Sequence, residues 1–207
     1  MTTGNNPENY ELLLFDIGGV LVRLTGVPRM MELTNRRFTI EQLWEKWIFS
    51  SSVRDYESGK ISTGAFGAAI VREFEMDIDP AEYCEEFRMW PSEKYPGVNE
   101  LLLHLKERIP LASLSNTNDL HWDRVVNEMN FIHLFDCNFP SHKTGFLKPD
   151  RDAFLNVVER TGTPPERILF FDDNEPNVQG ARDAGLDAVK IDGFTALKRY
   201  LENSGWL

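Results

Sequence analysis

Short apolar runs of strand length recur along this chain of 207 residues and alternate with helical patterns. We predict strands at residues 12–15, 111–114, 168–171 and 188–191, with a weaker candidate in FDCNF, which begins at Phe135. Helical periodicity occupies much of the chain between them, at residues 98–108, 119–129, 152–160 and 176–184. This alternation predicts an α/β fold in which a parallel sheet has helices on both faces.

One long segment, residues 25–95, interrupts the alternation, since it has the patterns of three or four helices and no convincing strand. Thr39 and Gln42 have the spacing of a capping box, and Asp79 followed by Pro80 is typical of a helix N-terminus. We therefore predict two domains. Residues 1–24 and 96–207 form the core, and residues 25–95 form a helical cap inserted after the first strand.

The charge balance argues against a nucleic-acid partner. The chain has 33 acidic and 22 basic residues, a formal net charge of −11, and no basic run that would attract a phosphate backbone. No segment approaches the length of about 20 apolar residues that a membrane span needs, and the first ten residues are polar rather than signal-like. Cys84 and Cys137 are typical of free thiols in a reducing compartment. We expect a cytoplasmic protein without a membrane partner, and the sequence leaves the oligomeric state open.

Polar residues follow the predicted strands or lie in the loops between them. They are Asp16, Ser115-Asn116, Lys148 in the loop KTGFLKPD, and Asp172-Asp173. Ligands of open α/β sheets bind beyond the carboxyl ends of the strands, where the strand order reverses. We therefore expect these side chains to meet at one edge of the sheet.

The chemistry of these side chains is complementary. Three carboxylates close together repel one another unless a divalent cation lies among them, and hard oxygen ligands are those that Mg²⁺ prefers. A serine hydroxyl, backbone amides and a lysine can bind the oxygens of a phosphoryl group. An aspartate can then attack phosphorus in line and form an aspartyl-phosphate that water hydrolyses. The sequence thus predicts a Mg²⁺-dependent phosphatase for a small phosphorylated metabolite.

The segments FDIGGVL, SNT, GFLKPD and FFDDNEPNVQGA resemble, in this order, the four motifs of the haloacid dehalogenase-like hydrolase superfamily. Together with YESGKIS in the predicted cap, these motifs are most similar to those of bacterial phosphatases of the α-D-glucose-1-phosphate phosphatase type. They are also similar to the N-terminal phosphatase domain of soluble epoxide hydrolases. This resemblance implies a Rossmann-like core, a helical cap whose closure excludes water, and a sugar 1-phosphate as one candidate substrate.

The resemblance also implies roles for the matching residues. Asp16 is the expected nucleophile. The expected phosphate-binding residues are Ser115, Asn116 and Lys148, of which Lys148 also serves catalysis. The expected Mg²⁺ ligands are Asp16, Asp172, Asp173 and the backbone carbonyl of Gly18.

Gly18 departs from the usual family pattern, which has a second aspartate there as general acid and base. Loss of such a group costs about 10²–10⁴ in rate, and phosphates with acidic leaving groups, such as anomeric and acyl phosphates, suffer least. His121 and Arg23 are candidate replacements. Sugar-1-phosphate phosphatases of the similar type include members with glycine at this position.

Three other functions are compatible with parts of the pattern. A 2-haloacid dehalogenase uses the same nucleophile without a metal, which the Asp172-Asp173 pair disfavours. A phosphoacceptor signalling domain has its paired acids after the first strand, whereas here they come late. A phosphate-binding protein with little turnover is supported by Gly18 alone.

Overall fold

Five strands form one parallel sheet in the computed structural model, which describes residues 6–207. In spatial order they are β5 (Cys137–Pro140), β4 (Leu111–Ser115), β1 (Leu12–Phe15), β6 (Ile168–Asp172) and β7 (Asp187–Lys190). Each neighbouring pair is parallel. The chain runs from β1 outward through β4 to β5 and then returns to β6 on the other side of β1, so the strand order reverses beside β1. The α/β class and the parallel sheet are confirmed.

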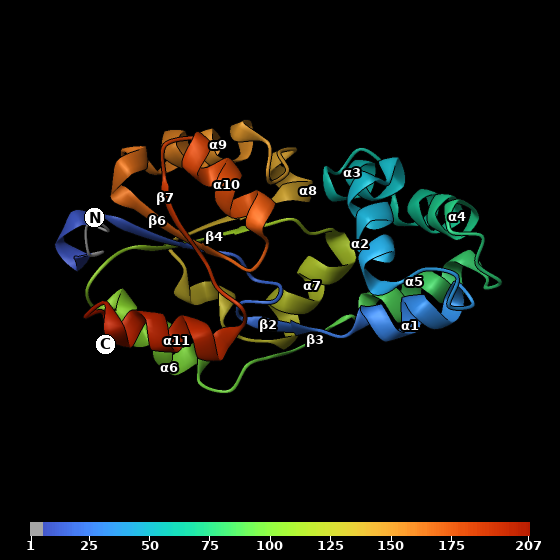
Figure 1. The fold of residues 1–207 in the computed structure, drawn as a ribbon, viewed down its shortest axis with the longest axis horizontal. Coiled ribbons are helices and arrows are strands. Elements are labelled where there is room, and N and C mark those ends of the chain that lie inside the picture. Colours follow the sequence, from blue (N-terminus) through green and yellow to red (C-terminus); the bar gives the residue numbers. More distant parts are fainter. Residues whose placement is uncertain (1–5) are drawn as a thin grey trace.

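Helices cover both faces of this sheet (Figure 1). Leu13 and Phe15 point to one face and Leu12 and Leu14 to the other, because successive side chains of a strand alternate, and all four are buried. The first face packs against α6 (Val98–Lys106), α7 (Asp119–Glu128) and α11 (Phe194–Asn203). The second packs against α9 (Arg151–Thr161) and α10 (Glu175–Asp183).

Five helices lie between the short strands β2 (Val22–Leu24) and β3 (Pro91–Lys94), which pair with each other antiparallel. We call residues 25–90 the insert. Its helices are α1 (Gly26–Leu33), α2 (Ile40–Phe49), α3 (Ser51–Glu57), α4 (Thr63–Glu73) and α5 (Pro80–Arg88). The expectation of three or four helices and no strand in residues 25–95 is therefore wrong. The sequence PSEK of β3 lacks apolar alternation because this strand pairs with one short partner and buries little surface.

The insert has a core of its own, in which the rings of Phe66, Tyr83 and Phe87 are buried. Its helix starts follow from the sequence. The Thr39 side chain accepts from the Gln42 amide, and the Gln42 side chain accepts from the Thr39 amide, which completes the capping box. The division of the chain at residues 25 and 95 into separate domains remains a prediction.

Polar contacts hold the insert against the core. Arg54 of α3 forms an ion pair of 2.9 Å with Asp150, which precedes α9. Thr63 Oγ1, at the start of α4, donates to Asp119 Oδ2 of α7 at 2.9 Å. The insert thus lies beyond the sheet edge where β1, β4 and β6 end, and it contacts the core there (Figure 1).

Short elements complete the described chain. They are α8 (Ser141–Thr144) and the 3₁₀ turns Pro7–Asn9, Ile132–Leu134 and Pro165–Arg167. Within residues 6–207, no helix has both the length and the apolar character required to cross a bilayer.

Candidate active site

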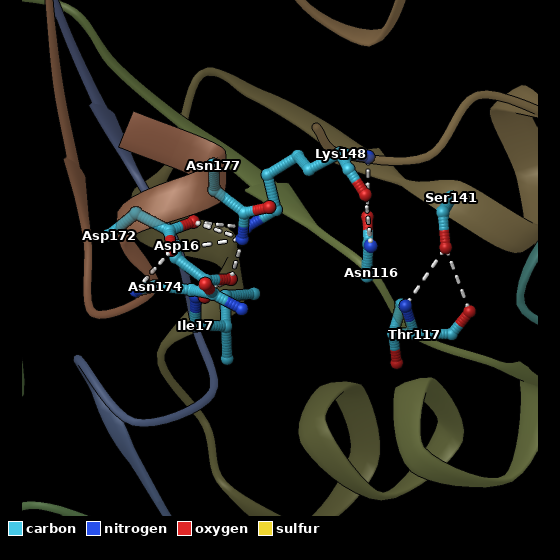
Figure 2. A network of polar contacts seen from close by, with 9 residues as sticks. All are labelled: Asp16, Ile17, Asn116, Thr117, Ser141, Lys148, Asp172, Asn174 and Asn177. Carbon is cyan, nitrogen blue, oxygen red and sulfur yellow. Dashed lines mark hydrogen bonds and ion pairs between the residues drawn. The ribbon is translucent and has the colours of Figure 1, made fainter. Parts of the chain in front are cut away.

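The polar residues that follow the strands converge at the carboxyl edge of the sheet, as their positions predict (Figure 2). Asp16 follows β1, Asp172 ends β6, and Lys148 reaches in from the loop before α9. Lys148 Nζ lies 2.9 Å from Asp16 Oδ1 and 2.6 Å from Asp172 Oδ2. One ammonium group therefore bridges the carboxylates of two neighbouring strands.

Lys148 is charged despite complete burial. Burial by itself lowers the pKa of its ammonium group, but the carboxylates of Asp16 and Asp172 outweigh this effect and raise the pKa above its ordinary value. Burial raises the pKa of Asp16, Lys148 opposes that rise, and Asp172 and Asp173 add to it by repulsion. The site holds more negative than positive charge, which favours a cation.

Asp172 is the best satisfied of the carboxylates. Its side chain is fully buried and accepts from Lys148, from the Asn174 amide at 2.9 Å and from Asn177 Nδ2 at 3.0 and 3.1 Å (Figure 2). Asn174 is the N-cap residue of α10, and Asn177 lies in its first turn. The start of this helix therefore fixes the carboxylate of Asp172. Asn174 and Asn177 lie in the segment FFDDNEPNVQGA, but their roles are not among those expected from the sequence.

Asp173 lies against the backbone of the loop after β1. Gly19 has φ +75°, and a Cβ atom there would overlap Asp173 Oδ2, so this close approach requires glycine. Burial and the repulsion of Asp172 raise the pKa of Asp173 to about 6. A ligand oxygen from each of Asp16, Asp172 and Asp173 lies within 4.8 Å of the other two. Three convergent carboxylates with a single lysine between two of them fit a hard divalent cation such as Mg²⁺.

Ser115 and Asn116, which end β4 and follow it, differ in what their side chains do. Ser115 is buried, and its hydroxyl has no hydrogen-bond partner within residues 6–207, so it can serve an incoming ligand. Asn116 instead donates from Nδ2 to the Lys148 carbonyl at 2.8 Å and accepts from the Lys148 amide at 2.9 Å. The Asn116 side chain, expected to bind phosphate, positions the backbone of Lys148.

A second brace supports the same loop region. Ser141 Oγ accepts from the Thr117 amide and donates to the Thr117 carbonyl, each at 2.9 Å (Figure 2). Ser141 is not among the site residues expected from the sequence. No sequence signal near it indicates this pairing, because the contact joins the ends of two neighbouring strands.

Gly18 has no side chain where the usual family pattern has an acidic one, and the side chain of Leu24 lies close to that position. A Cβ atom at Gly18 would lie 3.1 Å from Cδ1 of Leu24, the last residue of β2. Leu24 is 48% exposed, so it can move aside for a larger residue. An apolar side chain thus lies where the general acid of the usual pattern begins.

Neither expected replacement for that acid faces the site. His121 Nε2 donates to the Phe87 carbonyl at 2.7 Å, and its ring packs on the Phe87 ring. Burial lowers the pKa of His121 to about 4, although this hydrogen bond opposes the change. Arg23 pairs with Glu93 at 3.0 Å and lies over the Tyr95 ring. Among residues 6–207 neither candidate contacts the acidic cluster. His121 contacts the insert, and Arg23 contacts Glu93 of β3 and the Tyr95 ring.

The class that this fold and site define is that of α/β proteins with an acidic, lysine-bridged centre at the carboxyl edge of a parallel sheet. The chain belongs to the haloacid dehalogenase-like hydrolases, a family that it matches over residues 10–185.

The chain is also similar to individual proteins of known name or structure. The chain is 23% identical to the fructose-1-phosphate phosphatase YqaB of Escherichia coli, with 89% of this chain and 97% of that one covered. It is 33% identical over 90 residues to the drimenol cyclase drtB of Aspergillus calidoustus, of which it spans 17%, with 44% of this chain covered. A HAD family enzyme of Bacteroides thetaiotaomicron, solved in complex with magnesium and inorganic phosphate, superimposes with a TM-score of 0.73 at 26% identity, covering 88% of this chain and 94% of that one.

Proposed function

We propose that this protein is a Mg²⁺-dependent phosphatase that hydrolyses a small phosphorylated metabolite through an aspartyl-phosphate. The observation that carries the proposal is the bridging of Asp16 and Asp172 by Lys148 within a cluster of three carboxylates. The phosphatase name of the E. coli relative and the magnesium and phosphate of the Bacteroides structure support it. A sugar 1-phosphate is the candidate substrate that best suits Gly18, because its leaving group needs less protonation than an ordinary alcohol.

Asp16 is the nucleophile in this proposal. The contacts of its carboxylate involve Oδ1, which accepts from Lys148 and from the Ile17 amide at 2.7 Å. Within the described chain Oδ2 receives no such contact, so it is the oxygen available to attack phosphorus. Lys148 and the hydroxyl of Ser115 bind the phosphoryl oxygens, and their donors compensate the charge that would otherwise repel the nucleophile.

The carboxylates of Asp16, Asp172 and Asp173, with the backbone carbonyl of Gly18, would hold Mg²⁺. When bound, the ion neutralises charge on the phosphoryl group. Asn174 and Asn177 fix Asp172 so that its carboxylate does not reorganise on binding.

The insert controls access. The side chains of Lys148 and Asp172 are 1% and 0% exposed, and that of Asp16 is 11% exposed. A substrate therefore needs the insert to move before it reaches Asp16, and return of the insert excludes water. We also expect a cytoplasmic location and a small-molecule substrate rather than a nucleic acid.

Two other functions are less well supported. A 2-haloacid dehalogenase needs no cation, so it gives no reason to gather Asp172 and Asp173 beside Asp16 at a cost in repulsion. A phosphate-binding protein with little turnover rests on Gly18 alone.

A screen of phosphorylated metabolites with and without Mg²⁺ tests the proposal. It should include sugar 1-phosphates, sugar 6-phosphates and a 2-chloroacid. Release of phosphate from at least one sugar phosphate, lost on removal of Mg²⁺, is the expected result. Halide release without phosphate release, or metal-independent turnover, would contradict it.

A further inference from the structure

One acidic residue of the insert lies where the insert meets the loop of Lys148. Glu57 is the last residue of α3, which packs against α8. Arg54, one turn earlier on α3, pairs with Asp150. Gly59, two residues later, lies so close to α8 that a Cβ atom there would overlap the His142 carbonyl oxygen. Glu57 thus lies between two points at which the insert touches the core, on either side of the segment that carries Lys148.

The Glu57 carboxyl group has no partner of its own. Within residues 6–207 it makes no hydrogen bond and no ion pair, although it is largely removed from solvent. Burial raises its pKa to about 7, and Lys148 and Arg54 oppose the rise without cancelling it. The other titratable groups on the elements packed against α3 are Glu41, Glu45 and Lys46 on α2, Arg72 and Glu73 on α4, and His142 and Lys143 on α8. The carboxyl group is therefore able to exchange a proton near neutral pH.

The proposed reaction needs a group that can donate a proton on the side of the site that the insert covers. In an in-line displacement the leaving oxygen lies opposite the nucleophile. Asp16 is at the sheet edge, so the leaving group lies on the side that the insert covers. The positive charge of Lys148 favours the ionised form of Glu57. The same ammonium group contacts Asp16. Gly18 supplies no carboxyl group from the core.

We propose that Glu57 is the general acid and base that the core lacks, an inference that rests on the proposed phosphatase activity. As Asp16 Oδ2 forms its bond to phosphorus and the bond to the leaving oxygen breaks, Glu57 gives its proton to that oxygen. Glu57, now a carboxylate, takes a proton from water as the water oxygen attacks phosphorus. The bond between phosphorus and Asp16 breaks, and inorganic phosphate, the Asp16 carboxylate and protonated Glu57 result.

The test compares E57Q with the wild type on two substrates, an alkyl phosphate and 4-nitrophenyl phosphate. Glutamine keeps the shape but transfers no proton. On the alkyl phosphate, kcat should fall by about 10²–10⁴. On 4-nitrophenyl phosphate, departure needs little protonation but water attack still needs a base, so E57Q should show a burst approaching one equivalent of nitrophenol per site.

A matched control is D55N, which removes a negative charge from the same helix at a half-exposed position paired with Lys60 at 3.6 Å. It should keep wild-type kinetics on both substrates. The wild type gives a second measurement that needs no variant. Its kcat/KM on the alkyl phosphate should fall above about pH 7, where Glu57 loses its proton. The same limb should be absent from kcat/KM on 4-nitrophenyl phosphate, because departure of nitrophenol needs little protonation.

Equal losses on both substrates without a burst, or a change confined to KM, would overturn the assignment and leave Glu57 as a substrate contact. An unchanged pH limb in E57Q would overturn it as well. Failure of the proposed function is distinguishable, because the wild type would then release no phosphate from any substrate, or D16N would match it.

Discussion

The two sides of the candidate site differ in how their charges are satisfied. On the core side, Asp172 accepts from a lysine, an asparagine side chain and a backbone amide, and Lys148 is fixed through its own backbone by Asn116. On the insert side, Glu57 has no such partner within residues 6–207. The polar groups of the core are therefore held by several donors, whereas the insert presents an acidic group that none of the described residues binds. Substitutions on the core side should therefore have large effects on activity and stability.

The largest effect is expected from Asp16→Asn. Asparagine keeps the shape of the side chain but lacks the nucleophilic charge, so phosphatase activity should fall below about a hundredth of the wild-type value. Steady-state kinetics on the best substrate of the screen measure the loss, and circular dichroism checks the fold. Retention of more than that fraction would exclude covalent catalysis through Asp16. The core side of the site would then not supply the nucleophile.

The next largest effect concerns the ammonium group that joins the two strands. Lys148→Met leaves Asp16 and Asp172 buried without their cation, which should reduce the free energy of unfolding by about 3–5 kcal/mol. Urea denaturation at pH 7 gives the difference. Lys60→Met, at an exposed lysine of the insert, is the control and should change stability by less than about 0.5 kcal/mol. Similar values for the two variants would mean that the core cluster is not electrostatically preorganised.

A smaller effect is expected from Asn177→Ala. This change removes both hydrogen bonds from Asn177 to a fully buried carboxylate, at a cost of about 1–3 kcal/mol. Gln179→Ala is matched to it on α10, because Gln179 donates to the exposed carboxylate of Asp183 at 2.8 Å. Thermal denaturation of the pair separates the two cases, and an equal decrease in Tm would show that burial of Asp172 carries no special cost.

The last prediction concerns the cation. Binding to the folded state alone should stabilise the wild type by about 2.7 kcal/mol at a Mg²⁺ concentration a hundred times Kd. In Asp173→Asn one ligand is lost, so the rise in Tm on adding Mg²⁺ should be much smaller, whereas Asp183→Asn should retain it. A melting shift of equal size in Asp173→Asn and the wild type would refute Asp173 as a ligand.

The sequence predicts the core better than the insert, for a physical reason. The strands of the sheet are buried on both faces, so they stand out as short apolar runs, and parallel strands bring their carboxyl ends to one edge. The positions of Asp16, Lys148 and Asp172 follow from that rule. Helix α11 was missed although Phe194, Leu197 and Leu201 recur at helical spacing and are buried, because no strong capping residue marks its start.

The direction of a polar side chain could not be predicted in the same way. Asn116 binds the Lys148 backbone, and His121 packs on Phe87, because of contacts between segments distant in sequence. Glu57 lies in a quoted motif, YESGKIS, yet its position beside Lys148 depends on how the insert docks. Periodicity and spacing hold no information about that docking.

The paired strands β2 and β3 have a consequence for the history of such proteins. The chain leaves the core and returns to it at one place, with Leu24 opposite Pro91. The whole insert is therefore one long connection between the paired strands β2 and β3. The entropy cost of closing such a connection changes only slowly with its length. Helices can be added, removed or exchanged beyond this point without altering the strand order or the lysine-bridged aspartates. A lineage can change the helices that cover the site while the acidic centre of the core stays constant.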